Sequence, residues 1–431
     1  MKNRKIVEVK NILCSFFIVL LLAFASCKTI TAPVEIVPDF TGVIPWQSNT
    51  AEEYALLDRI GATWLLSTFY WSRIEREDDQ WNFERYDKYV DMAKAEGKKL
   101  LGVLGYSNEW IHDDGKWPYY IPPDKLHYFI DYVRHTAAHY KGRVDAWCIW
   151  NEPNFIFWEG SKKEFYELTR QAAEAIREED PDVIILGGAF NRGVFGLPRS
   201  FIRGLFESGS MEKVNGVAFH PYELNPKRSQ KLFRRFEKLC ARYGFDEVWS
   251  TETGYPTGGW YPTAVKEERF PEFVVKTYVY LAVEGASRVI WYQLFDPDER
   301  VKRNSEHFFG LVRSINDYTS KGAEAFRLCS LYLAGTTYSP ITTEKFPQSL
   351  KAYYFEKNES PGGKALVLWK SGLPIKFNMK IPGGGLLHDP VTGEAVEINS
   401  ETVISAGVTP IFITWQENEN TAGEPKLQRV R

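Results

Sequence analysis

Short apolar runs alternate with amphipathic stretches along most of the chain. Runs such as TWLLSTFYW and KKLLGVLGY are each followed by a stretch with apolar residues at helical spacing, such as FERYDKYVDMAKAEG. The runs favour covered strands and the stretches favour helices packed over them. Eight such units can be counted between residues 34 and 335. This alternation predicts an α/β fold, a closed (β/α)8 TIM barrel rather than an open doubly wound sheet.

From residue 336 the pattern changes to short strands separated by turn signals. KAYYFEK, KALVLWK, IKFNMKI and PIFITWQ alternate in polarity, and SPGGK, PGGGL and DPVTGE interrupt them. Short strands at such intervals are typical of an all-β module. We therefore expect a small C-terminal β-sandwich over residues 336–416. Residues 417–431 contain few apolar groups and are expected to form a flexible tail.

The first residues have the pattern of a targeting segment. MKNRKIVEVK carries several cations, and the apolar run ILCSFFIVLLLAFA is too short to span a bilayer comfortably but fits a signal-peptide core. The run ends in Phe24-Ala25-Ser26-Cys27, which resembles the lipobox of bacterial lipoproteins, although Phe24 stands where Leu is usual.

The lipobox resemblance implies that residues 1–26 are a lipoprotein-type signal peptide and that Cys27 is lipidated. The mature protein would then be exported and anchored to a membrane at its periplasmic or cell-surface face. An ordinary cleaved signal and an uncleaved anchor are the alternatives.

Charge and motif content exclude several classes of protein. The formal net charge of −3 over 431 residues gives no basic surface for nucleic acid, so nucleic acid is not an expected partner. No Gly-rich phosphate loop follows the first strand. The five Cys lack the spacing of a disulfide framework or a Cys metal site.

Two carboxylates stand where buried strands end. In WCIWNEPNF, strand-forming residues continue to Trp150 and Pro153 closes the run, so Glu152 lies at the end of the fourth strand. In VWSTETGYPT, Gly254 closes the seventh strand just after Glu252. Active sites of such barrels lie at these strand ends. Strands four and seven are roughly opposite, so the two carboxyl groups can meet across the mouth at about 5 Å, as retaining glycosidases require.

With these residues the chain resembles the retaining glycoside hydrolases of clan A, and families 39 and 5 in particular. The resemblance is carried by Asn151-Glu152-Pro153, by AFHPY (218–222), by Glu252 and by VIWYQLF (289–295). It covers most of residues 34–335. It implies hydrolysis of β-linked O-glycosidic bonds in an oligosaccharide or polysaccharide by double displacement, with neither cofactor nor metal.

The resemblance also implies roles for individual residues. Glu252 would be the nucleophile, and Glu152 would be the general acid and then the general base. We expect the pKa of Glu152 to be raised, because partial burial and the neighbouring carboxylate both disfavour a second negative charge.

Four further residues complete the implied site. Asn151 would bind the sugar hydroxyl next to the anomeric carbon, Tyr222 would hold Glu252, and His220 would orient this network. Trp291 would form a platform beneath the sugar. Many clan members support the nucleophile with an Arg in strand two, whereas this chain offers only Arg73, beyond the expected strand end.

Aromatic residues make up 15% of the chain, and flat rings suit the C–H faces of sugars. Those near expected strand ends or loops are candidate subsite residues: Trp46, Tyr70, Trp71, Tyr106, Trp110, Trp158 and Trp260.

Two other functions remain as alternatives. One is a non-catalytic carbohydrate-binding surface lipoprotein on a glycosidase-like barrel, which the presence of both Glu residues disfavours. The other is a metal-dependent amidohydrolase, which the low count of seven His disfavours. His135 and His139 have the spacing of a ligand pair, but HTAAH lacks the Glu of a zinc-protease helix, and we expect a solvated face there.

Overall fold

The computed structural model describes most of the chain from residue 32 onward. The described residues are 32–45, 49–113, 118–192, 198–260, 264–341, 347, 349–358, 363–381, 383–416 and 426–429. The expected signal peptide over residues 1–26, the lipidation site Cys27 and the candidate subsite residue Trp46 lie outside them. Among the described residues, no helix has the length and apolar character needed to cross a membrane.

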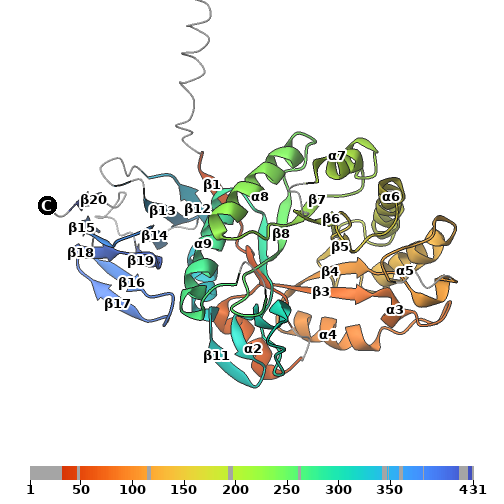
Figure 1. Ribbon diagram of the computed structural model, residues 1–431, viewed down its shortest axis with the longest axis horizontal. Coiled ribbons are helices and arrows are strands. Elements are labelled where there is room, and N and C mark those ends of the chain that lie inside the picture. The colour runs from red at the N-terminus through yellow and green to blue at the C-terminus, as the bar shows by residue number, and fades with distance from the viewer. Residues whose placement is uncertain are drawn as a thin grey trace, which may run out of the picture. The chain divides into compact units, whose positions relative to one another are not determined.

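Eight parallel strands close into a barrel (Figure 1). The first and last of them pair with each other through Gly42 and Ile290, which completes the ring. The barrel strands are β2 (Thr41–Val43), β3 (Trp64–Tyr70), β4 (Lys99–Gly105), β5 (Ala146–Asn151), β6 (Ile184–Asn191), β7 (Gly216–His220), β8 (Val248–Thr253) and β9 (Arg288–Trp291). The predicted fold class is confirmed.

Helices between the strands cover the barrel. Sequence signals fix where several begin: a capping box of Ser161 and Glu164 starts α6, and the Asn225 side chain accepts from the backbone N–H of Arg228 at the start of α8. The helices are α2 (Ala51–Ile60), α3 (Trp71–Ile74), α4 (Glu84–Ala95), α5 (Leu126–His139), α6 (Lys162–Glu179), α7 (Arg199–Glu207), α8 (Pro226–Ala241), α9 (Phe270–Val283) and α10 (Ala323–Leu333).

The barrel interior is filled by large side chains at its amino-terminal end. The rings of Trp64 and Trp249 meet edge to face at 4.7 Å, and the guanidinium of Arg288 lies 4.9 Å from the Trp249 ring. Asp39 binds both the Trp64 indole N–H, at 3.2 Å, and Arg288, at 3.0 Å. This packing closes the floor, so the opposite end, where the strands finish, is the open one.

A C-terminal β-domain follows α10. Its larger sheet has the order β1-β12-β13-β14-β19-β16-β17 and its smaller sheet the order β18-β15-β20. Apolar residues of both sheets form one buried cluster, including Leu366, Phe377 and Ile404, as in a β-sandwich. The strands after α10 are β12 (Thr336–Ser339), β13 (Leu350–Lys357), β14 (Gly363–Lys370), β15 (Ile375–Lys380), β16 (Gly385–His388), β17 (Ala395–Ile398), β18 (Glu401–Ala406), β19 (Ile411–Gln416) and β20 (Lys426–Arg429).

Two predicted boundaries are corrected by strand pairing. β1 (Val34–Ile36), which was expected to belong to the barrel, pairs antiparallel with β12 at the edge of the larger sheet. Residues 426–429, expected within a flexible tail, form β20 and pair with β15. Strands of three and four residues are too short to show an alternating pattern, so the sequence did not reveal either of them.

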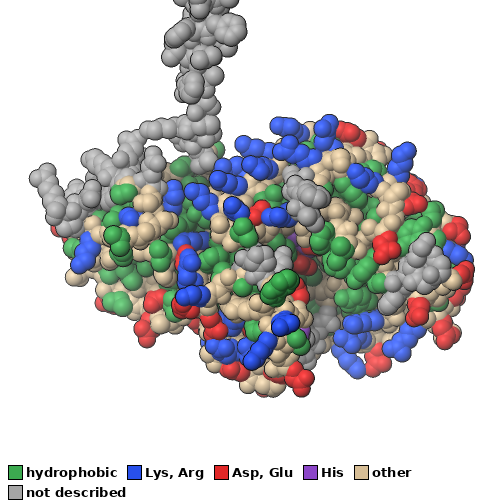
Figure 2. All heavy atoms as spheres, in the orientation of Figure 1, with side chains coloured by type: hydrophobic (Ala, Val, Ile, Leu, Met, Phe, Trp, Pro, Cys, Tyr) green, Lys and Arg blue, Asp and Glu red, His purple; other side chains and the backbone are tan. Residues whose placement is uncertain are grey.

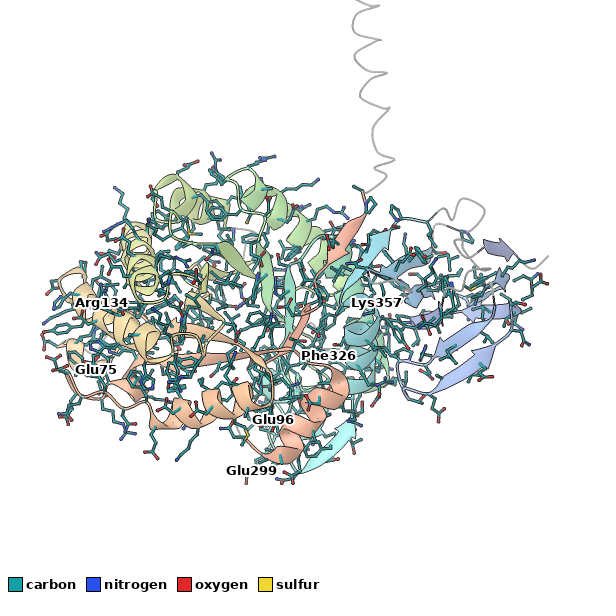
Figure 3. The ribbon with its side chains drawn as sticks, turned by 180° about the vertical axis from the view of Figure 1, so that it is seen from behind. Glu75, Glu96, Arg134, Glu299, Phe326 and Lys357 are labelled. Carbon is teal, nitrogen blue, oxygen red and sulfur yellow. The ribbon has the colours of Figure 1, made fainter. Side chains whose placement is uncertain are left out.

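The β-domain packs on the last helices of the barrel. Tyr280 of α9 meets Trp369 of β14 edge to face at 5.5 Å, and Lys276 Nζ donates to the carbonyl oxygen of Val408 at 2.8 Å. Phe326 of α10, labelled in Figure 3, packs edge to face on Tyr278 of α9.

A hollow of about 1280 Å³ lies on the β-domain, lined by residues that include Trp415. Neither candidate catalytic carboxylate lines this hollow.

Candidate active site

Glu152 leaves β5 in an unusual backbone conformation. Its φ is 44° and that of Trp150 is 67°, both in the left-handed region that non-glycine residues seldom adopt. The backbone N–H of Glu152 donates to the carbonyl oxygen of Ala189 in β6 at 2.8 Å, which holds this bend. Such conformations cost on the order of 1–3 kcal/mol each and cluster at functional sites.

The Glu152 side chain is buried and accepts two hydrogen bonds. Asn191 Nδ2, at the end of β6, donates to Glu152 Oε1 at 2.8 Å. His220 Nδ1, at the end of β7, lies 2.8 Å from the same oxygen. His220 Nε2 lies 3.1 Å from Thr251 Oγ1. Both ring nitrogens of His220 are therefore engaged, and the imidazole has a fixed orientation.

Glu252 faces Glu152 across the barrel mouth. Tyr222 OH donates to Glu252 Oε2 at 3.3 Å, and His220 Nδ1 lies 3.5 Å from that oxygen. One oxygen of each carboxylate and a ring nitrogen of His220 all lie within 4.8 Å of one another. The two carboxyl groups thus meet as the sequence predicts, at the short separation of a retaining rather than an inverting pair.

Burial and charge set the protonation of this pair. Burial raises the pKa of Glu252 to about 7; His220 opposes the rise, while the charge of Glu152 adds to it. Burial opposes protonation of His220, but Glu252 and Glu152 outweigh it and raise the pKa of the imidazole. Burial and Glu252 raise the pKa of Tyr222, which keeps this phenol a donor.

Asn151 connects the pair to aromatic residues of neighbouring strands. Its Nδ2 donates to Tyr106 OH, just after β4, at 3.1 Å. The Tyr106 ring lies 6.2 Å from that of Tyr70, at the end of β3. Two of the predicted subsite residues, Tyr70 and Tyr106, therefore adjoin the site.

The predicted sugar platform at Trp291 is wrong. Trp291 is 0% exposed, stacks on Tyr278 at 6.2 Å and donates its indole N–H to the carbonyl oxygen of Phe309 at 3.3 Å. The next residue, Tyr292, is half-buried, and burial together with Glu306 and Glu252 raises its pKa. Tyr292 therefore lies close enough to Glu252 to interact with its charge, and Trp291 does not form the expected platform.

The other predicted aromatic residues divide between core and surface. Trp71 and Trp158 are buried in the main core, which argues against subsite roles. Trp110 is half-buried, and Trp260 is 87% exposed. Arg73 lies 4.5 Å over the Tyr70 ring, and no contact with Glu252 is recorded for it among the described residues. Tyr222 and His220 support Glu252 instead.

Besides Tyr292, three residues of the site were not predicted from the sequence: Asn191, Thr251 and Glu306. Asn191 carried a usable signal, since it ends the fifth barrel strand as Asn151 ends the fourth. Thr251 sits inside β8, and Glu306 lies in a short helical turn, η4 (Ser305–Phe308), after β9. Neither position differs from an ordinary strand or loop residue in sequence.

The donor set of the site could also hold a metal ion. Glu152, Glu252 and His220 offer two carboxylates and an imidazole close enough to share one cation. The pair His135 and His139 does not form such a set. His139 Nε2 binds Asp87 Oδ1 at 2.7 Å, and the ring of His135 stacks on Trp81.

Comparison with known proteins gives partial sequence matches and extensive fold matches. The model of glycosyl hydrolase family 10 matches residues 66–171, which include Asn151 and Glu152. An endo-1,4-β-xylanase B of Thermotoga neapolitana is 25% identical over 207 residues, 44% of this chain. The chain spans just over half, 57%, of that relative's length.

Solved structures share the fold over nearly the whole chain. A family 39 glycoside hydrolase from Bacteroides cellulosilyticus has a TM-score of 0.73 at 18% identity, over 88% of this chain and 82% of that one. A family 39 β-xylosidase from Caulobacter crescentus has a TM-score of 0.64 at 16% identity, over 90% and 98% of the two chains. These comparisons confirm that the chain resembles the clan A glycoside hydrolases, with enzymes of family 39 among the proteins whose fold it shares.

Proposed function

We propose that the chain is a retaining glycoside hydrolase that cleaves β-linked O-glycosidic bonds. The observation that carries this proposal is the pair Glu152 and Glu252, which reach one another from β5 and β8 with His220 bridging them. A pair at this separation is suited to double displacement, because no space is left for a water between carboxylate and sugar.

The hydrogen bonds favour a definite role for each oxygen. Both bonds to Glu152 use Oε1, so within the described part of the chain Oε2 is left to carry the proton to the glycosidic oxygen. Glu252 is held at Oε2, which leaves Oε1 to attack the anomeric carbon. The bond from Glu252 forms as the bond to the leaving oxygen breaks, and Glu152 protonates that oxygen.

The second displacement reverses these roles. Forming the ester removes the negative charge of Glu252, and Glu152, which has given up its proton, can now act as the base for an incoming water. The water oxygen bonds to the anomeric carbon, its proton passes to Glu152, and the carboxylate of Glu252 is released. Asn151 is placed beside this centre to bind the neighbouring sugar hydroxyl. The similarity to a xylanase favours β-linked xylose as the first sugar to test.

A panel of aryl β-glycosides, assayed with and without a chelator, tests the function. We expect hydrolysis of at least one β-glycoside, with a β-xyloside tested first, and no loss of rate with the chelator. Chelator-sensitive hydrolysis would instead support metal chemistry at Glu152, His220 and Glu252. A folded protein inert on the whole panel, yet able to bind oligosaccharides, would support the non-catalytic alternative.

We further propose that the enzyme is exported and anchored by a lipid at Cys27. The support is the sequence alone: the cationic start, the short apolar run and the lipobox-like Phe24-Ala25-Ser26-Cys27. Expressed in a bacterium, the full chain should sediment with membranes, and Cys27→Ala should release it to the soluble fraction. Unchanged membrane association of Cys27→Ala would favour an uncleaved anchor instead.

A further inference from the structure

A basic pocket lies beside the carboxyl end of β3. The pocket has a volume of about 640 Å³, and its lining includes four cationic side chains and one carboxylate. Figure 2 shows Lys and Arg side chains gathered over α4. The lining residues are Asn49, Arg73, Arg76, Asn82, Glu84, Arg85 and Lys88.

Four acidic side chains between residues 75 and 87 form hydrogen bonds with residues that do not line the pocket. Glu75, labelled in Figure 3, is buried and accepts from the Trp71 indole at 2.6 Å. Asp87 binds His139 of α5 at 2.7 Å. Two more acids are bonded within their own turn: Glu77 accepts from Gln80, and Asp79 accepts from Trp81. The pocket lining therefore carries a larger excess of positive charge than the sequence of residues 73–88 suggests.

Inside the pocket, the positive charge is only partly neutralised. Lys88 pairs with Glu84 at 2.9 Å, and Arg73 lies against the Tyr70 ring. No ion pair is recorded for Arg76 or Arg85 with any residue that the structure describes. Two guanidinium groups facing one hollow are suited to planar, bidentate recognition of a carboxylate or sulfate.

A series of side-chain contacts leads from the pocket lining to the candidate active site. Arg73 lies 4.5 Å from the ring centre of Tyr70, whose ring lies 6.2 Å from that of Tyr106. Tyr106 in turn accepts the hydrogen bond from Asn151, next to Glu152. A sugar chain bound over these tyrosines would carry its next unit toward the arginines.

We propose that this pocket is a subsite for an anionic substituent, a uronic acid carboxylate or a sulfate ester, on the oligosaccharide substrate. This proposal extends the proposed glycosidase function and depends on it, because the anionic oligosaccharide is taken to be the substrate of that reaction. Arg76 and Arg85 bind the anion.

Binding measurements test the subsite independently of turnover. The Kd values of a neutral xylo-oligosaccharide, of the same oligosaccharide bearing one glucuronic acid, and of a sulfated form are measured by calorimetry on Glu252→Gln protein. We expect one anionic form to bind at least tenfold more tightly than the neutral one. Arg76→Gln with Arg85→Gln should remove this preference and change the Kd of the neutral form less than twofold. The two anionic forms show which group the site accepts.

A matched control removes the same charge elsewhere. Arg235→Gln with Arg242→Gln, near the far end of α8, should leave the preference intact. Equal affinity for neutral and anionic forms, or equal loss in both pairs of variants, would overturn the subsite. Anion preference in a protein that hydrolyses no glycoside would uphold the subsite and refute the proposed function.

Discussion

Replacing Glu252 with Gln should lower kcat for β-glycosides by about 10⁴- to 10⁶-fold, because an amide cannot form the glycosyl ester. The measurement is the steady-state rate on the best aryl glycoside of the panel. Glu268→Gln, an exposed Glu on the loop after β8, is the control and should keep full activity.

The same variant should be folded and, above neutral pH, more stable than the wild type. The pKa of Glu252 is about 7 in the fold against an ordinary 4.5, so its contribution to stability is fully present below pH 4.5 and is lost as pH rises through 7. Gln cannot ionise, so the variant avoids a loss of stability on the order of 3 kcal/mol. Thermal unfolding at pH 5 and pH 8 should show the gain only at pH 8. Substantial turnover by the Glu252→Gln variant would show that Glu252 is not the nucleophile.

Replacing Glu152 with Ala should lower the rate about 10²- to 10⁴-fold for glycosides with poor leaving groups. With an activated aryl glycoside the first step needs no acid, so a burst of released phenol should precede slow turnover. Azide should restore that turnover, because an anionic nucleophile attacks the glycosyl ester without a general base. Pre-steady-state release of the phenol and identification of the glycosyl azide are the measurements.

Glu159 offers the matched control for the acid–base residue. It follows the same strand but is exposed, so Glu159→Ala should behave as wild type on every substrate. If Glu152→Ala showed neither a burst nor azide rescue, the acid–base role would have to pass to another residue.

Site residues could be predicted from the sequence where a reactive side chain stands at the recognisable end of a strand. Asn-Glu-Pro marks Glu152 because Pro153 cannot continue a ladder, and Glu252 is marked in the same way by Gly254. The eight repeated units then place both on one rim of a barrel. His220 and Tyr222 followed from the family resemblance, and the contacts of both with the carboxylates fit the expectation.

The remaining errors arise from features that the pattern does not encode. Neighbouring residues of a strand point to opposite sides, so an error of one position at the end of β9 exchanged Trp291 for Tyr292. Thr251 resembles any other strand residue until the fold brings it to His220. The charge segregation around Arg76 and Arg85 also depends on which way each side chain turns, and the composition of that segment conceals it.

The pairing of β1 with β12 bears on how the chain could be rearranged. Val34–Ile36 precede the barrel in sequence yet complete a sheet built after it, so the barrel is inserted into the β-domain rather than fused in front of it. A fragment ending at residue 335 would lack β12, so β1 would have no strand to pair with. A fragment starting at residue 40 would lack β1, so the backbone hydrogen-bonding groups at that edge of β12 would be exposed. A recombined protein would have to exchange both flanks together with the barrel.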